Sequence, residues 1–202
     1  MAGVSIEVDA KSLDDLIAAT VELAGEMGSD EMKFAMGTAM KETIRDHFGE
    51  IAQDSEHHQS ALSLGATPTG FYEEARDKTQ DPQIKAEGVS VSIDQEGLAQ
   101  RYFGGDIEAR PGGFLTIPAR GEAYGKRAGD FPNLKLIIFP SGLAALVDRD
   151  EPKDEGGVYY WLVRSVHQNA DPGILPTDDE LTDSALESGT SYLDSIWQRQ
   201  LA

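Results

Sequence analysis

Residues 97–118 read GLAQRYFGGDIEARPGGFLTIP, and they indicate the fold more strongly than any other stretch. The pair Gly104–Gly105 follows two aromatic residues, and glycine pairs occur where a backbone takes a positive φ or passes close to another segment. The runs Asp106–Arg110 and Phe114–Pro118 have the composition of strands around a turn at residues 111–113. Two such runs around a three-residue turn that contains Gly predict a β-hairpin. A phosphate-binding loop is not indicated, because a strand rather than a helix follows the glycines.

Further strands are predicted on both sides of this hairpin. Apolar residues alternate with polar ones at Val4–Val8, Val89–Ile93 and Leu134–Ile138, and Leu143–Val147 returns after a Pro-Ser-Gly turn. The most apolar run is Val158–Val166, in which apolar side chains fall on both faces. A strand of this kind is central in a sheet, or a partner covers its second face.

Helical spacing precedes the strands. Apolar residues recur every three or four positions in residues 12–27 and 30–53, with Gly28 between the two predicted helices. Residues 71–79 predict a short helix. Between them, residues 54–70 are polar and show no periodic pattern, so we expect a long mobile loop or arm.

The C-terminal part, residues 173–202, is predicted to be helical. Thr177 and Glu180 have the spacing of a capping box, and Gly189 is expected to break or kink the helix. Taken together, the patterns predict one α+β domain over residues 1–202. We expect N-terminal helices, a central antiparallel sheet of about five or six strands and a C-terminal helix.

Composition excludes several kinds of site. The chain of 202 residues has no cysteine, so it can form no disulfide and no thiolate metal site. Its formal net charge of −19 disfavours a broad nucleic-acid interface, since phosphate contacts need Lys and Arg. The charge is uneven: residues 101–135 carry six basic and four acidic side chains and form a mildly basic island. No apolar run approaches the length of a membrane span, and we expect no membrane association.

The hairpin region also carries a resemblance. Five segments in this order resemble the virion-morphogenesis, or tail-completion, proteins of tailed bacteriophages: residues 66–72 (ATPTGFY), 88–93 (GVSVSI), 99–107 (AQRYFGGDI), 114–119 (FLTIPA) and 123–127 (AYGKR). The resemblance covers residues 60–140. Beyond residue 160 the chain departs from the family, because an acidic tail stands where the family often has a basic, Pro-rich stretch.

The resemblance implies a structural protein of the virion neck, at the head–tail junction. Such a protein completes the head-proximal end of the tail and joins the tail to the capsid as a subunit of a closed ring, often a hexamer. Its expected partners are further copies of itself and the neighbouring tail terminator, tail tube and head–tail adaptor proteins. DNA would pass through the ring without sequence-specific binding, and no cofactor and no catalytic activity are implied.

The basic island and the apolar strand supply the candidate contacts of such an interface. These candidates are Arg101, Tyr102, Phe103, Lys126, Arg127, Tyr159, Trp161 and Val163.

Two other classes of function stay open at this point. His57 and His58, with Asp54 and Glu56 nearby, would be the centre of a metal-dependent hydrolase. Adjacent histidines do not generally point the same way, and the spacing is not that of known zinc sites, so we predict no metal site here. The second alternative is a binding domain of non-viral origin.

Overall fold

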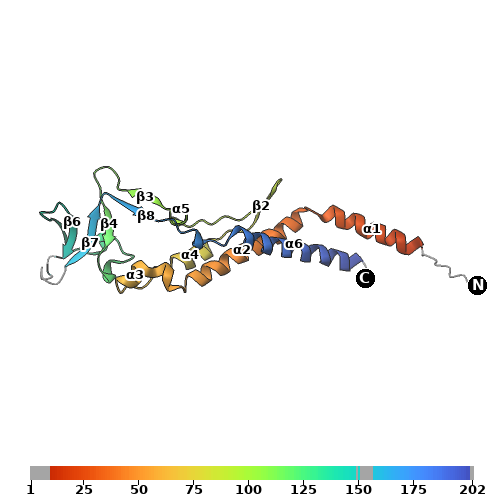
Figure 1. Cartoon of the computed structure of the whole chain (residues 1–202), viewed down its shortest axis with the longest axis horizontal. Helices are drawn as coiled ribbons and strands as arrows, with labels where there is room; N and C mark the ends of the chain where they lie inside the picture. The colour runs from red at the N-terminus through yellow and green to blue at the C-terminus, as the bar shows by residue number, and fades with distance from the viewer. Residues whose placement is uncertain (1–9, 149, 151–156, 201–202) are drawn as a thin grey trace, which may run out of the picture. The chain divides into compact units, whose positions relative to one another are not determined.

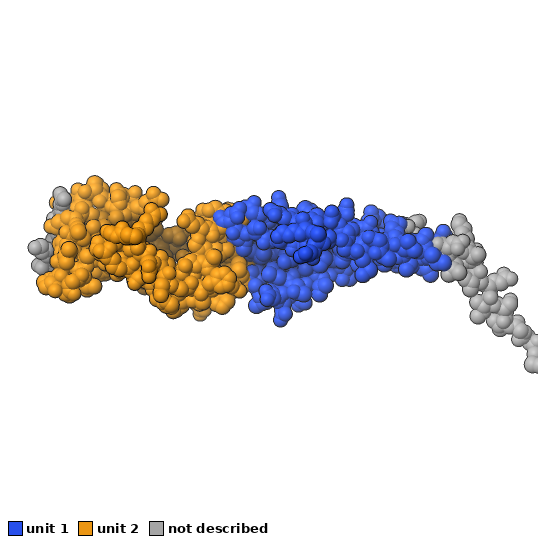
Figure 2. Space-filling view, turned by 90° about the horizontal axis from the view of Figure 1, so that it is seen from above, with its two compact units in different colours: residues 1–45, 79–94, 176–202 blue, residues 46–78, 95–175 orange. Residues whose placement is uncertain are grey.

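The computed structural model describes residues 10–148, 150 and 157–200, so the strand expected at Val4–Val8 lies outside the described residues. Contacts divide the chain into two compact units, coloured separately in Figure 2. Unit 1 comprises residues 1–45, 79–94 and 176–202, and unit 2 comprises residues 46–78 and 95–175. The expectation of a single domain stays a prediction, because one domain can contain two contact units.

Unit 1 is mainly helical. It contains α1 (Ala10–Glu26), most of α2 (Asp30–Ile51) and α6 (Asp178–Gln200), together with the antiparallel pair β1 (Gln83–Lys85) and β2 (Gly88–Ser90). α1 and α6 lie side by side (Figure 1). The predicted capping box is confirmed: Glu180 N–H donates to Thr177 Oγ1 at 3.2 Å, and Thr177 N–H donates to Glu180 Oε2 at 2.8 Å.

The predicted break at Gly189 is wrong, since α6 continues through it. A Cβ atom at Gly189 would lie 3.1 Å from Cε of Met32 and 3.3 Å from Cγ of Met36. The glycine therefore serves close packing of α6 against α2. Two hydrogen bonds join the same helices: Thr43 Oγ1 donates to Ser184 Oγ at 2.8 Å, and Ser188 Oγ donates to the carbonyl of Ala35 at 3.0 Å.

Unit 2 begins with the last turn of α2 and short helices. These are η1 (Ser55–His58), α3 (Gln59–Ser63), α4 (Phe71–Asp77) and α5 (Leu98–Phe103). Two short helices therefore lie within residues 54–70, where no regular structure was expected, and the mobility of this segment stays a prediction. Asp54 caps η1 by accepting from Glu56 N–H at 3.0 Å, and Ala61 is fully buried. Short polar helices of this kind have too few turns to show a periodic pattern.

The remaining strands form two antiparallel sheets in unit 2. β3 (Gly105–Glu108) pairs with β8 (Ser165–Gln168). The four-stranded sheet has the order β4–β7–β6–β5, formed by β4 (Leu115–Pro118), β7 (Val158–Val163), β6 (Ala144–Asp148) and β5 (Leu134–Ile138). Between β4 and β5 lie the short 3₁₀ helices η2 (Gly121–Ala123) and η3 (Ala128–Asp130), and η5 (Pro172–Ile174) follows β8.

The predicted hairpin is wrong, although its turn exists. Gly112 has φ 80°, and Gly113 N–H donates to the carbonyl of Arg110 at 2.8 Å. However, β3 pairs with β8 and β4 pairs with β7. The segments on the two sides of the turn therefore diverge, because they pair with different parts of residues 158–168.

The predicted strand Val158–Val166 is interrupted at Arg164. Its carbonyl accepts from Ala109 N–H at 2.8 Å, and its guanidinium bonds the carbonyl of Gly113 and lies 4.0 Å from the ring centroid of Phe114. Arg164 thus sits where the chain passes from the four-stranded sheet to the two-stranded one. The expected α+β class with helices at both ends is confirmed, but within the described residues the antiparallel strands form sheets of two, two and four strands rather than one sheet of five or six.

No helix within the described ranges is long and apolar enough to cross a membrane.

Candidate protein interface

On the central strand β7, side chains on one face of the four-stranded sheet are packed and Trp161 on the other face is more open. On the first, which we call the Tyr160 face, Tyr160 is 1% exposed and Leu162 is 9% exposed. In the register, Tyr160 pairs with Leu146 and Leu162 with Ala144, so β6 continues this face. The hydroxyl of Tyr160 donates to the carbonyls of Ala123 and Lys126, at 3.2 and 3.0 Å. The segment between β4 and β5 therefore covers the Tyr160 face at β7.

The opposite face, which we call the Trp161 face, is formed in register by Ile117, Trp161, Ala145 and Ile137. Trp161 is 37% exposed, although it stands on a central strand. Its ring packs against Phe139 with 6.0 Å between centroids. Leu143, in the turn after Phe139, is 54% exposed. Val163 stands beside Trp161 on this side and pairs with Leu115. This face is apolar and partly open to solvent.

Tyr159 does not share the surroundings of Trp161, contrary to the simple alternation of a strand. The register shifts between Leu146 and Val147, so a β-bulge falls at this end of β7. The ring of Tyr159 lies 5.0 Å from that of Phe131 and 4.6 Å from the guanidinium of Arg120. Lys126 Nζ also approaches the Phe131 ring, at 5.6 Å.

Lys126 and Arg127 are both exposed. Arg127 begins η3, and its N–H donates to Asp130 Oδ2 at 2.9 Å. Lys126 beside Phe131 and its neighbour Arg127 are the exposed cations of this segment, and we call them the basic rim.

The three candidates at residues 101–103 lie on α5. Arg101 is not a free surface cation: its guanidinium is 4.1 Å from the Phe71 ring centroid and donates to the hydroxyl of Tyr72 at 3.4 Å. Burial raises the pKa of Tyr72 above its ordinary value of 10.0, while Arg101 opposes this effect. Phe103 is 74% exposed, and its ring stands edge-on to Tyr102 at 4.8 Å. Only Phe103 of these three presents a large apolar surface to solvent.

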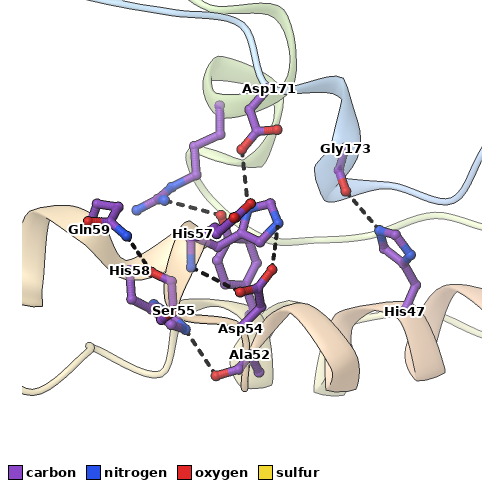
Figure 3. A network of polar contacts seen from close by, with 12 residues as sticks. His47, Ala52, Asp54, Ser55, His57, His58, Gln59, Asp171 and Gly173 are labelled. Atoms are coloured by element: carbon purple, nitrogen blue, oxygen red, sulfur yellow. Dashed lines mark hydrogen bonds and ion pairs between the residues drawn. The ribbon is translucent and has the colours of Figure 1, made fainter.

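Arg101 and Tyr72 adjoin a polar network that the sequence did not suggest: the carbonyl of Arg101 accepts from Asp171 N–H at 3.0 Å, and the Tyr72 ring lies 5.8 Å from that of His57. Figure 3 shows the network around His57 and Asp171. His57 Nδ1 is 3.3 Å from Asp171 Oδ2, and its Nε2 is 4.0 Å from Asp54 Oδ2. Close by, a ring nitrogen of His47 bonds the carbonyl of Gly173 at 2.9 Å. The network joins the last turn of α2 and η1 to the segment after β8.

The two adjacent histidines do not converge on one point. His57 faces Asp171, whereas His58 Nε2 bonds the carbonyl of Ala52 at 2.9 Å. Within the part of the chain that the structure describes, no group of three or more His, Cys, Asp or Glu side chains is arranged to hold a metal ion.

The sequence reasoning missed an exposed apolar strip on β5. Leu136 is 54% exposed and Ile138 is 68% exposed, and both continue the Tyr160 face, since they pair with Leu146 and Ala144. The alternation of Leu134, Leu136 and Ile138 in the sequence predicts a strand here, but sequence alone does not show which strand lies at the edge of a sheet. The eight candidates thus divide among a sheet face, a basic rim and the end of α5.

No family model matches the chain, and neither the curated proteins nor the solved structures contain a match.

Proposed function

We propose that this protein is a structural subunit of a tailed-bacteriophage neck, which completes the head-proximal end of the tail and joins it to the capsid as part of a ring around the DNA channel. The proposal rests on the five ordered segments in residues 60–140 that resemble tail-completion proteins. The observation on the molecule that favours an assembly role is the exposure of Trp161 on a central strand. Large exposed apolar side chains in an apolar surface often mark protein interfaces.

A ring requires a heterologous contact, in which one patch meets a different patch on the next copy. The Trp161 face with its neighbour Leu143 is the proposed apolar patch, and the exposed cations Lys126 and Arg127, in the segment that covers the opposite face of the sheet, form a second and separate patch. The chain carries 36 acidic and 17 basic side chains, so a basic rim has many acidic counterparts on another copy.

The acidic balance also fits a channel that lets DNA pass. Phosphates and carboxylates repel one another, so a lumen lined by acidic side chains does not retain DNA. We expect no measurable DNA binding at physiological salt.

Native mass spectrometry and negative-stain electron microscopy of the purified protein test the ring. We expect closed particles with a central hole and one defined copy number. A protein that stays monomeric at about 100 µM, alone and when co-expressed with the products of adjacent genes, would contradict the proposal.

Elemental analysis tests the rival hydrolase. That function requires about one bound metal ion per chain, lost in a His57→Ala, His58→Ala double variant. We expect no stoichiometric metal in either protein, because His57 Nδ1 and His58 Nε2 contact different groups, Asp171 and the carbonyl of Ala52.

A further inference from the structure

The free edge of β5 presents a strip of aliphatic side chains next to a row of backbone groups. Among the strands that the structure describes, β5 is an outer strand of the four-stranded sheet, bordered by β6 on one side only. Its sequence is LKLII, with one charged residue and no proline. Exposed, apolar edge strands are sites where a further strand adds to a sheet.

The hydrogen-bond pattern shows which backbone groups face outward. Phe139 N–H donates to the carbonyl of Leu143 at 2.8 Å, so the inward-facing residues of β5 are those with odd numbers. The N–H and C=O groups of Leu134, Leu136 and Ile138 therefore point to the free edge. Leu134 N–H reaches the carbonyl of Phe131 at 3.4 Å, which leaves Leu136 and Ile138 as the donors toward a new strand.

The other free edge of this sheet is less suited to pairing. β4 ends in Pro118, which lacks an N–H group, and proline is a common device that blocks edge pairing. β5 is instead bracketed by Pro132 and Pro140, each four residues from Leu136. A strand that pairs with β5 over its full length must therefore avoid proline at both ends.

We propose that β5 pairs with β5 of a second copy, antiparallel and centred on Leu136. In this register Leu136 lies opposite Leu136, Leu134 opposite Ile138 and Lys135 opposite Ile137. The two Leu136 residues exchange N–H···O=C bonds, and Ile138 N–H reaches the carbonyl of Leu134 on the other strand. A shift of two residues would bring Pro132 or Pro140 opposite a strand residue, so the prolines select the centred register.

Side-chain chemistry points to a second copy as the occupant. The aliphatic side chains of the two copies meet, Leu136 with Leu136 and Leu134 with Ile138, and they continue the Tyr160 face across the join. The pairing thereby covers Leu136 and Ile138, the two most exposed residues of β5. Lys135 lies opposite an isoleucine, so no like charges are directly opposed. Copies with a net charge of −19 repel one another, and β5, which has no acidic residue, is a place where they can approach.

Because the chain has no cysteine, single cysteine variants report the register directly. Directly opposite residues of a hydrogen-bonded antiparallel pair have Cα atoms about 5.5 Å apart, within the range of a disulfide. Under mild oxidation we expect Leu136→Cys to form a covalent dimer at least tenfold faster than Ile138→Cys. Ile138 is the more exposed of the two, so random collision would give the opposite order. Thr116→Cys on β4 should stay monomeric.

Sedimentation of unmodified protein provides the second measurement. We expect Leu136→Lys to raise the dissociation constant of the dimer at least tenfold while its circular dichroism stays unchanged, since the site is already half exposed. The pairing does not depend on the proposed neck function, so Leu136→Cys should cross-link equally well when Trp161 is replaced by Ala. Equal cross-linking of Leu136→Cys and Ile138→Cys, preferential cross-linking through β4, or an unchanged dissociation constant in Leu136→Lys would overturn it.

Discussion

The hydroxyl of Tyr160 donates to the carbonyl oxygen of Lys126 at 3.0 Å, and so ties the exposed basic rim to the middle of the four-stranded sheet. The same hydroxyl lies 3.2 Å from the carbonyl of Ala123, which is fully buried. A single side chain on β7 therefore positions the segment between β4 and β5.

Tyr160→Phe should destabilise the protein by about 0.5–1.5 kcal/mol, because it removes the hydroxyl donor beside the carbonyls of Lys126 and Ala123. The free energy of unfolding in urea measures this loss. Tyr102→Phe, at a half-buried tyrosine of α5, is the control, and we expect it to cost less. Equal losses in the two variants would show that the hydroxyl of Tyr160 does not anchor the segment.

Stability should fall as the pH rises above about 10. Burial raises the pKa of Tyr160 above its ordinary value of 10.0, and the carboxylate of Asp130 acts in the same direction. The folded state thus holds this proton more tightly than the unfolded state, so its contribution is complete below pH 10 and is lost as the pH passes through the folded-state pKa. Tyrosinate absorbance should show a late-titrating group that Tyr160→Phe removes, and the variant should lose less stability between pH 9 and 12. A titration unchanged by the substitution would contradict this assignment.

Gly104→Ala should destabilise much more than Gly112→Ala. Both residues have positive φ, 67° and 80°, so both substitutions carry backbone strain, and the ψ of −160° at Gly104 places it in a region that is almost exclusive to glycine. At Gly104, however, an added Cβ would also lie 2.5 Å from the backbone nitrogen of Ala170, whereas at Gly112 nothing lies within 4 Å. We expect a further loss of at least about 2 kcal/mol at Gly104. Similar melting temperatures for the two variants would mean that residues 168–170 can move away from α5.

The fold class followed from the sequence because it depends on local patterns. Helical spacing, the capping box at Thr177 and Glu180, and the alternation of Leu134, Leu136 and Ile138 all appear as short-range signals. Strand pairing could not be predicted from such local patterns. β3 and β4 pair with strands about fifty residues away, and the turn between β3 and β4 does not determine these partners. The sheet order that leaves Leu136 and Ile138 exposed is a long-range property of the same kind.

His57 should hold η1 and α3 against the segment after β8. Its contact with Asp171 joins residues far apart in the chain, so we expect His57→Ala to increase amide hydrogen exchange in residues 54–63 about tenfold or more. Glu56→Ala, at an exposed position of the same helix, is the control and should leave the exchange unchanged. Fast exchange in this segment of the wild-type protein would instead support the mobile loop expected from the sequence.

Trp161→Ala should weaken ring assembly without unfolding the subunit. The indole is 37% exposed and rests on Phe139, so its loss removes apolar contact area from the proposed interface while Tyr160 and Leu162 keep the opposite face packed. Aromatic residues at the centre of an interface cost about 2 kcal/mol or more on truncation, which corresponds to an increase of about thirtyfold in the dissociation constant. Sedimentation at matched concentrations measures it, and Phe34→Ala, at a 50% exposed residue of α2, is the control. If Trp161→Ala keeps the wild-type oligomer but melts far earlier, Trp161 belongs to the core of the subunit and the ring contact lies on another surface.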